Sequence, residues 1–159
     1  MNSKPILMIH DITEDIFSLP LENYILTFDD GLTKHYTYYD NFKKINTEKI
    51  YFIPTGITEL TIEQIKCISN DPLTTIGGHS HLHKSLKLFE TLDLKIKHIM
   101  SDTELMINWF EQNLNEIPDK FCYPFNDDCN GIYTAIVRKY GFTKLYGRER
   151  IPVETLLHN

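Results

Sequence analysis

The sequence predicts an α/β fold, a distorted and incomplete (β/α) barrel with six or seven parallel strands. Short apolar or β-branched segments alternate with helical patterns along the 159 residues, which indicates a parallel sheet with helices outside it. Carboxylate and imidazole side chains directly follow several of these segments, as they do at the carboxyl ends of barrel strands. Six or seven strands are too few for a complete eight-fold barrel, so the barrel is expected to be incomplete.

Six segments are predicted to be strands because each is short, apolar or β-branched, and bounded by Gly, Pro, Asn or Asp. They are Ile6–Ile9, Tyr24–Phe28, Ile50–Ile53, Thr74–Ile76, Phe121–Tyr123 and Thr143–Tyr146. The last segment, Arg148 to Asn159, has no clear pattern. Its charged start, Arg148-Glu149-Arg150, could face a substrate, but a solvated tail is the favoured interpretation.

Four stretches between the strands carry apolar side chains at helical spacing: residues 38–45, 60–65, 92–110 and 132–141. In the second stretch, Thr61 and Gln64 have the spacing of a capping box, with Leu60 and Ile65 placed as a hydrophobic staple. Gly141 ends the last stretch, as glycine commonly does after a helix. We therefore expect helices in the connections between the strands.

Composition indicates one compact domain, residues 1–159, large enough to bury a core. Hydrophobic residues make up 42% of the chain and aromatic residues 12%, and the formal net charge is −6. No basic run or basic-aromatic patch is present, so nucleic acid is not an expected partner. The acidity also argues against binding to an anionic membrane surface.

The first apolar stretch, after Pro5, is interrupted by His10 and Asp11 and is too short for a signal sequence or a membrane-spanning helix. The three cysteines, at positions 67, 122 and 129, are an odd number without metal-type spacing. That usage suits a reducing compartment. We therefore expect a cytoplasmic protein without a membrane span.

The segment Ile25–Phe28 places an apolar strand directly before Asp29, Asp30 and Gly31. Two neighbouring carboxylates point in different directions, so one can bind a cation while the other faces whatever the cation activates. Gly31 then lets the chain turn away. The same residues are also typical of a plain strand followed by an Asp-Gly turn.

The segment Gly77–His83 contains three of the seven histidines, and His79 and His83 stand four residues apart. On a helical turn this spacing brings two imidazoles to one side, where they can bind a divalent metal together. Imidazole nitrogen with carboxylate oxygen suits Zn²⁺, Co²⁺, Ni²⁺ or Fe²⁺ better than Mg²⁺ or Ca²⁺. The alternative is a solvated polar loop, but the cluster together with the Asp pair favours a metal site.

Three motifs carry a family resemblance. Thr27–Gly31 reads TFDDG, His79–His83 matches H-[ST]-x-x-H, and Phe121–Asn126 is similar to F-x-Y-P-[FY]-G. In this order and spacing they resemble the polysaccharide deacetylase (NodB-homology) family, also called carbohydrate esterase family four. The resemblance spans roughly residues 5–146 and implies the incomplete barrel that the strand pattern predicts.

The resemblance implies that Asp30, His79 and His83 bind one divalent metal, with Zn²⁺ the first choice, and that Asp29 is the general base. It also implies that the backbone N–H of Phe125 helps to hold the oxyanion. The chemistry is consistent, because a cation bound by one carboxylate and two neutral imidazoles keeps enough charge to lower the pKa of water toward neutrality. A backbone donor suits the oxyanion because it is in place before the reaction.

The chain departs from the family pattern in two places of the third motif, and its last motif has a single candidate. Cys122 occupies the position where the third motif often carries an arginine that orients the base, and Asn126 replaces the closing glycine. The Leu-x-His motif that supplies the family's general acid has one candidate here, Leu156-Leu157-His158 at the end of the chain. His10, which follows a predicted strand, is the reserve candidate for the acid.

Three functions are compatible with the sequence. The first is metal-dependent hydrolysis of an N-acyl group, N-acetyl above all, from an amino sugar, with an amino-sugar, nucleotide-sugar or glycan substrate in surface polysaccharide biosynthesis. The second is another metal-dependent amidohydrolase or a phosphoesterase that uses His79 and His81, although in amidohydrolases such a pair normally follows the first strand. The third is a non-catalytic sugar-binding domain, favoured by Cys122 and by the terminal position of His158.

Overall fold

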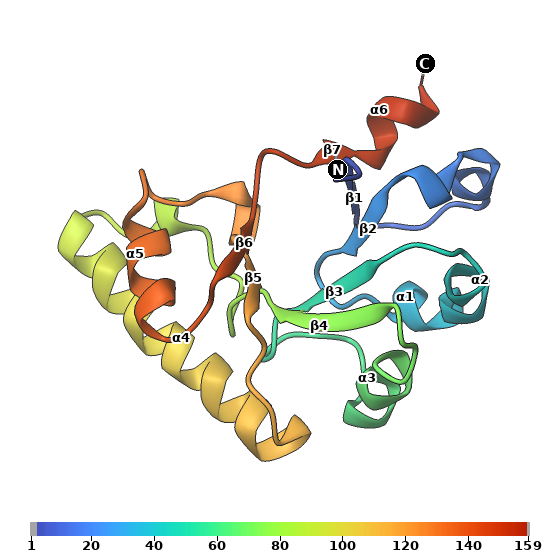
Figure 1. The fold of residues 1–159 in the computed structure, drawn as a ribbon. Coiled ribbons are helices and arrows are strands. Elements are labelled where there is room, and N and C mark those ends of the chain that lie inside the picture. Colours follow the sequence, from blue (N-terminus) through green and yellow to red (C-terminus); the bar gives the residue numbers. More distant parts are fainter. Residues whose placement is uncertain (1–2, 159) are drawn as a thin grey trace.

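Seven parallel strands form one curled sheet in the computed structural model, which describes residues 3–158. The strands are β1 (Ile6–Ile9), β2 (Ile25–Phe28), β3 (Lys49–Ile53), β4 (Thr74–Gly78), β5 (Lys120–Cys122), β6 (Lys144–Tyr146) and β7 (Ile151–Pro152). Their order across the sheet is β6-β5-β4-β3-β2-β1-β7, and all neighbours are parallel. The sheet curls into half a barrel with helices alongside (Figure 1), which confirms the predicted fold class.

The six predicted strands all form, with ends that differ by a few residues. The seventh, β7, lies in the segment that had no clear pattern. It pairs with β1 through Leu7 opposite Ile151 and Met8 opposite Pro152. Two residues are too short to show an alternating pattern, and Pro152 is tolerated because β7 is an edge strand.

Helices fill the connections as expected. They are α1 (Thr33–Thr37), α2 (Tyr39–Lys43), α3 (Ile62–Ile68), α4 (Leu92–Leu114), α5 (Ile132–Lys139) and α6 (Val153–Leu157), with short 3₁₀ turns η1 (Glu14–Ser18), η2 (Leu21–Asn23), η3 (Leu86–Leu88) and η4 (Pro124–Asn126). The longest, α4, begins after Thr91, whose hydroxyl accepts a hydrogen bond from the Leu94 N–H, and ends at Asn115 in the left-handed conformation. No helix within residues 3–158 is long and apolar enough to cross a bilayer.

The central strand β3 is buried along its whole length, and its alternating side chains divide the core in two. Tyr51 faces the helices and stacks on Phe28 with ring centroids 4.3 Å apart. Ile50 and Phe52 face the other way and pack with Cys122 in a small inner cluster. The hollow side of the sheet is therefore partly filled with apolar side chains, on which the polar site rests.

Helix α3 has the capping box that its sequence predicts. The Thr61 hydroxyl accepts a hydrogen bond from the Gln64 N–H at 3.1 Å, and the Gln64 side chain accepts one from the Thr61 N–H at 2.9 Å. Replacing Thr61 with Ala should lower the free energy of unfolding by about 1 kcal/mol, because the first turn loses its acceptor. Urea denaturation measures this effect. Thr61→Ser keeps the hydroxyl and is the control; equal stability of the two variants would contradict the role of the cap.

Candidate metal centre

Three donor atoms converge at the carboxyl ends of β2 and β4. Asp30 Oδ1 lies 3.1 Å from His79 Nε2 and 3.1 Å from His83 Nε2, and the two imidazole nitrogens are also 3.1 Å apart. A tetrahedral Zn²⁺ with bonds of about 2.0–2.1 Å needs neighbouring donor atoms roughly 3.3 Å apart. One carboxylate oxygen and two imidazole nitrogens at this spacing therefore fit a divalent transition metal and leave room for further ligands.

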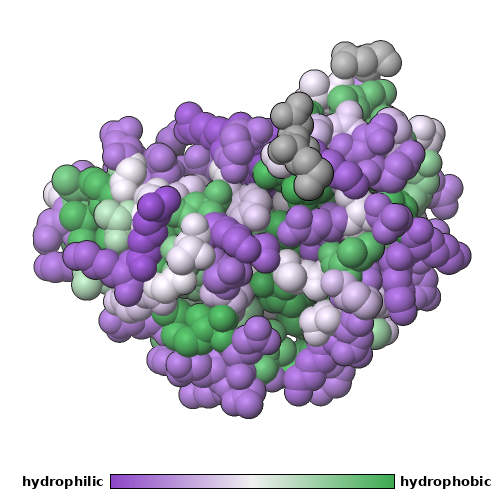
Figure 2. Space-filling model, in the orientation of Figure 1, coloured by the Kyte–Doolittle hydropathy of each residue, from purple (hydrophilic) through white to green (hydrophobic). Residues whose placement is uncertain are grey.

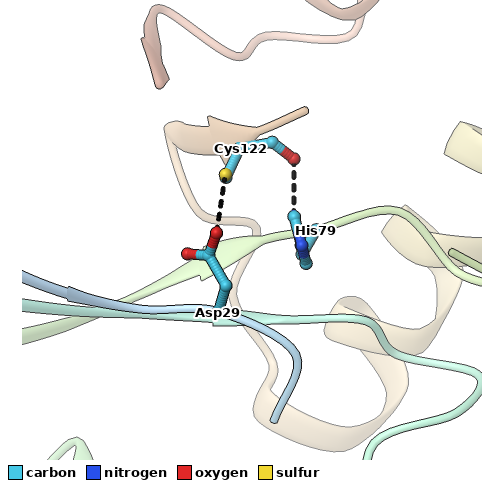
Figure 3. A group of neighbouring side chains, drawn as sticks. All are labelled: Asp29, His79 and Cys122. Atoms are coloured by element: carbon cyan, nitrogen blue, oxygen red, sulfur yellow. Dashed lines mark hydrogen bonds between the residues drawn. The ribbon is translucent and has the colours of Figure 1, made fainter. Parts of the chain in front are cut away.

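The hydrogen bond of His79 determines which of its nitrogens can bind a metal. His79 is buried, and its Nδ1 lies 2.8 Å from the carbonyl oxygen of Cys122 on the neighbouring strand (Figure 3). A carbonyl only accepts, so Nδ1 must carry the proton and donate it. The lone pair is then on Nε2, the atom that faces Asp30 and His83, which is the arrangement that a metal ligand requires.

His79 and His83 meet through an irregular turn and not through the helical turn that their spacing suggested. Ser80 and His83 both have the left-handed backbone conformation, with φ of 67° and 53°. The Ser80 hydroxyl accepts a hydrogen bond from the His83 N–H at 2.9 Å. Local backbone geometry, and not helical periodicity, therefore brings the second imidazole back to the first.

The two adjacent aspartates face different surroundings. Asp29 is 2% exposed, whereas the side chain of Asp30 is 29% exposed at the surface of the site. Asp30 has a φ of 82° and Gly31 one of 58°, so the chain turns sharply after β2. A Cβ on Gly31 would lie 2.2 Å from Thr58 Oγ1, so only glycine fits. Burial alone raises the pKa of Asp30, but its contacts with the His79 and His83 imidazoles outweigh burial and hold the pKa well below its usual value.

Asp29 is held by Arg150, which is 4% exposed. The two terminal nitrogens of its guanidinium donate to Asp29 in parallel, Nη1 to Oδ1 at 2.8 Å and Nη2 to Oδ2 at 2.9 Å. The remaining three N–H groups donate to the Gly147 carbonyl, the Thr27 hydroxyl and the Asn126 side chain. All five donors of the guanidinium are thereby satisfied inside the protein.

This pairing corrects the interpretation of Arg148-Glu149-Arg150 as a solvated tail. Arg148 and Glu149 are exposed, but Arg150 is buried beside the site. The sequence gives only an indirect signal for Arg150: with Cys122 in the third motif, Asp29 lacks the arginine that the family often carries there. Burial raises the pKa of Asp29, but nearby His79 and the Arg150 hydrogen bonds outweigh burial, so the net pKa is lowered.

Cys122 lies against Asp29. Its Sγ is 3.6 Å from Asp29 Oδ2, and the thiol donates to that oxygen (Figure 3). Asp29, His79 and Cys122 offer donor atoms close together, but burial and then the charge of Asp29 raise the pKa of the thiol well above its usual value. Asp29 is already paired with Arg150, and His79 Nδ1 donates to the Cys122 carbonyl, so these groups are engaged within the protein.

The site opens into a cavity of about 130 Å³. Its lining residues are His10, Asp29, Asp30, His79, His83, Tyr123, Phe125 and Asn126. The Phe125 ring is 59% exposed and packs on His83 with centroids 4.7 Å apart, and Phe125 and Asn126 both have positive φ. A larger hollow of about 510 Å³ lies beside the amino ends of β4 and β5, but none of these residues lines it.

The two candidates for the general acid lie in different places. His10, which follows β1, lines the cavity, and its Nε2 is 3.6 Å from Asp29 Oδ2 and 3.7 Å from Asp30 Oδ2. The buried His35 supports it by donating from Nε2 to the His10 carbonyl at 2.7 Å. His158 is exposed after α6 and is not among the described residues that line the cavity.

The chain belongs to the polysaccharide deacetylase family, because the sequence model of that family matches residues 20–145. The sequence matches none of the curated proteins with which it was compared.

Several solved structures share the fold. IcaB from Ammonifex degensii superimposes with a TM-score of 0.73 at 18% identity, over 94% of this chain and 84% of that one. The Streptococcus pyogenes deacetylase PplD, solved with acetate, gives 0.65 at 17% identity, over 98% and 96%. A family 4 carbohydrate esterase from Streptomyces lividans, also with acetate, gives 0.60 at 12% identity, over 91% and 62%.

Replacing Arg150 with Met should lower the free energy of unfolding at pH 7 by roughly 3–5 kcal/mol, because Asp29 is left buried and unpaired. In the unchanged protein the pKa of Asp29 is lowered, so its charge stabilises the fold above the pKa of the unfolded chain, and this contribution is lost as pH falls through the folded-state pKa. Without Arg150, burial raises that pKa, so the deficit should shrink between pH 7 and pH 4.

Urea denaturation at the two pH values measures this difference. Arg148→Met is the control, because Arg148 is exposed and makes one hydrogen bond, to the Asn126 carbonyl. The control should change stability by about 0.5 kcal/mol or less. A pH-independent deficit in Arg150→Met would contradict the role of the Asp29 charge.

Proposed function

We propose that the protein is a metal-dependent hydrolase that removes an N-acyl group, N-acetyl above all, from an amino sugar. Family membership indicates polysaccharide deacetylation. The observation that carries the finer proposal is a buried, ionised carboxylate, Asp29, directly beside a three-donor metal site in one cavity. Hydrolysis of an amide requires both an activated water and a group that takes its proton, and these residues can provide for both.

In this proposal Asp30, His79 and His83 hold the metal, which is Zn²⁺ or, as alternatives, Co²⁺, Ni²⁺ or Fe²⁺. When bound, the metal supplies Lewis-acid chemistry that favours ionisation of water and polarises an acyl oxygen. Asp29 takes the proton of the attacking water. Arg150 keeps Asp29 ionised and in a fixed orientation, so that no rearrangement of the base is needed before the proton moves.

The oxyanion that forms on the acyl group needs a donor that is already in place. We propose the backbone N–H of Phe125, whose residue lines the cavity and packs on His83. A backbone donor in a defined turn has no rotamer freedom to lose during the reaction. The exposed Phe125 ring also offers an apolar surface on which a sugar ring can rest.

We propose His10 as the general acid in place of His158. His10 lines the cavity, and its Nε2 lies 3.6 Å from Asp29 Oδ2 and 3.7 Å from Asp30 Oδ2. An imidazole N–H at this place can donate a proton to the leaving amine. His158 offers no such arrangement, because it is exposed outside the cavity lining.

The alternatives explain fewer of these observations. A non-catalytic sugar-binding domain was favoured by Cys122 and by the terminal His158, but Arg150 and His10 offer the missing arginine and imidazole from other positions. An amidohydrolase site that uses His81 is disfavoured, because His81 Nδ1 lies 2.8 Å from the Thr55 hydroxyl and is engaged away from the metal donors.

The cavity limits the substrate. A volume of about 130 Å³ is well below the roughly 300 Å³ at which drug-sized ligands begin to fit. We therefore propose that the acyl group enters while the sugar lies outside, as part of an amino-sugar, nucleotide-sugar or glycan substrate of surface polysaccharide biosynthesis. The cysteines at 67, 122 and 129 are all free thiols, which supports the further proposal of a reducing, cytoplasmic compartment.

The roles of Asp29 and Asp30 should be separable. Asp29→Asn should retain the metal but lower turnover by ~10²–10⁴-fold, because proton transfer to the base is lost. Asp30→Asn should also reduce metal content, because it removes a ligand. Metal analysis and acetate release from a panel of N-acetylated amino sugars measure the two effects. Metal loss in Asp29→Asn with retention in Asp30→Asn would reverse the assignment, and no acetate release from any substrate by the unchanged protein would contradict the hydrolase.

The assignment of the acid predicts a contrast between two histidines. His10→Gln should lower turnover by ~10²–10⁴-fold, because the leaving amine loses its proton donor. His158→Gln should leave turnover unchanged. Initial rates of acetate release distinguish the variants, and the opposite pattern would assign the acid to His158.

A further inference from the structure

The turn between the two metal-site histidines presents three consecutive backbone N–H groups to acceptors on one side. The N–H of His81 donates to Asp102 Oδ2 at 2.8 Å, and that of Leu82 donates to Asp102 Oδ1 at 2.9 Å. The third, from His83, donates to the Ser80 hydroxyl. Successive N–H groups near a left-handed residue form a concave anion site, and here the anion is the Asp102 carboxylate.

Asp102 approaches the turn from helix α4, which is distant in sequence. Its side chain is 1% exposed, and both of its carboxylate oxygens are used by the turn. The ion pairs found among residues 3–158 all involve other carboxylates. A buried carboxylate without a cationic partner is costly, and for Asp102 the two backbone N–H groups of the turn offset that cost.

The opposite side of the turn is held by the loop after β3. The Gly56 N–H donates to the His81 carbonyl at 2.7 Å, and the Thr55 hydroxyl is hydrogen-bonded to Nδ1 of the His81 ring at 2.8 Å. A Cβ on Gly56 would lie 2.7 Å from that carbonyl, so the two backbones touch. The turn is thus held by two groups: the loop after β3 contacts the His81 carbonyl and ring, and the Asp102 carboxylate accepts from the His81 and Leu82 N–H groups.

We infer that Asp102 is a positioning residue for the metal centre: it holds the His81–Leu82 backbone so that His79 and His83 present both Nε2 atoms to one ion. This inference rests on the proposed metal site. Asp102 places a buried negative charge beside the His81–Leu82 backbone. A divalent cation bound by His79 and His83 would partly offset this charge. Without Asp102 the two N–H groups lose their acceptors, and the His83 imidazole is no longer held at its 3.1 Å spacing from His79.

The test is the metal affinity of Asp102→Asn, measured for Zn²⁺ by competition with a chromophoric chelator. An Asn side chain of the same shape can accept only one of the two N–H groups and turns its own amide hydrogens toward the other. We expect affinity to fall about 10–100-fold, the usual effect of removing a group that orients metal ligands. The absorption spectrum of the Co²⁺-loaded protein should also change, because the ligand geometry relaxes.

Asp71→Asn is the matched control. Asp71 is also buried and also accepts from a backbone N–H, that of Leu73 at 3.1 Å, but it lies just before the amino end of β4, at the opposite end of that strand from the metal site. It pairs with Lys49, so its loss should destabilise the fold without changing Zn²⁺ affinity or the Co²⁺ spectrum. Asp102→Glu and Ser80→Ala give a second measurement should Asp102→Asn fail to fold, with smaller losses of affinity expected.

The outcomes are separable. Unchanged Zn²⁺ affinity and an unchanged Co²⁺ spectrum in the folded Asp102 variants, with tight binding by the unchanged protein, overturn the positioning role and leave the proposed function intact. An equal loss of affinity in Asp71→Asn reduces the effect to general stability and also overturns it. Absence of Zn²⁺ binding in the unchanged protein overturns the proposed function and this inference together.

Discussion

The buried pair of Asp29 and Arg150 is the interaction on which the site depends. It joins the end of the inner strand β2 to the segment that precedes the edge strand β7. That segment crosses between β6 and β7, the two edges of the half-barrel, so the same guanidinium also helps to close the open side of the structure. Burying either group alone would cost several kcal/mol, whereas together, with five donors satisfied, they form a stable polar centre.

The pair also explains why adjacent aspartates can do different work. Asp29 continues the strand inward to Arg150, and Asp30 leaves it through a left-handed turn toward the imidazoles. Both have a lowered pKa, to which His79 contributes in each case, together with Arg150 for Asp29 and with His83 for Asp30. The two carboxylates thus occupy different surroundings, although a single peptide bond separates them, and the proposed division into a base and a metal ligand follows this difference.

The chain shows how a required group can come from a different place in the sequence. The third-motif position holds Cys122, whose small thiol leaves room beside Asp29 and donates only weakly to it. The Arg150 side chain reaches Asp29 from the segment that precedes β7. Its guanidinium carbon lies 5.9 Å from the centroid of the Phe52 ring on the inner face of the sheet. His10 provides an imidazole in a similar way from the end of β1. An arginine or imidazole can reach Asp29 from more than one position in the chain, because a curled parallel sheet brings the carboxyl ends of several strands close together.

The sequence by itself determined the fold class, six of the seven strands and the capping box of α3, because short apolar segments between turn residues and a Thr-x-x-Gln spacing are visible within a few positions. It also indicated that Asp30, His79 and His83 converge, because each follows a predicted strand of a parallel sheet and together they match the family motifs, although the turn that joins the two histidines is irregular and not helical. Only the tertiary structure decided that Arg150 pairs with Asp29, that Asp102 clamps the histidine turn, and that His10 rather than His158 lines the cavity. These contacts join residues 19 to 121 positions apart, and one side chain meeting another across the sheet leaves no periodic signal in the chain.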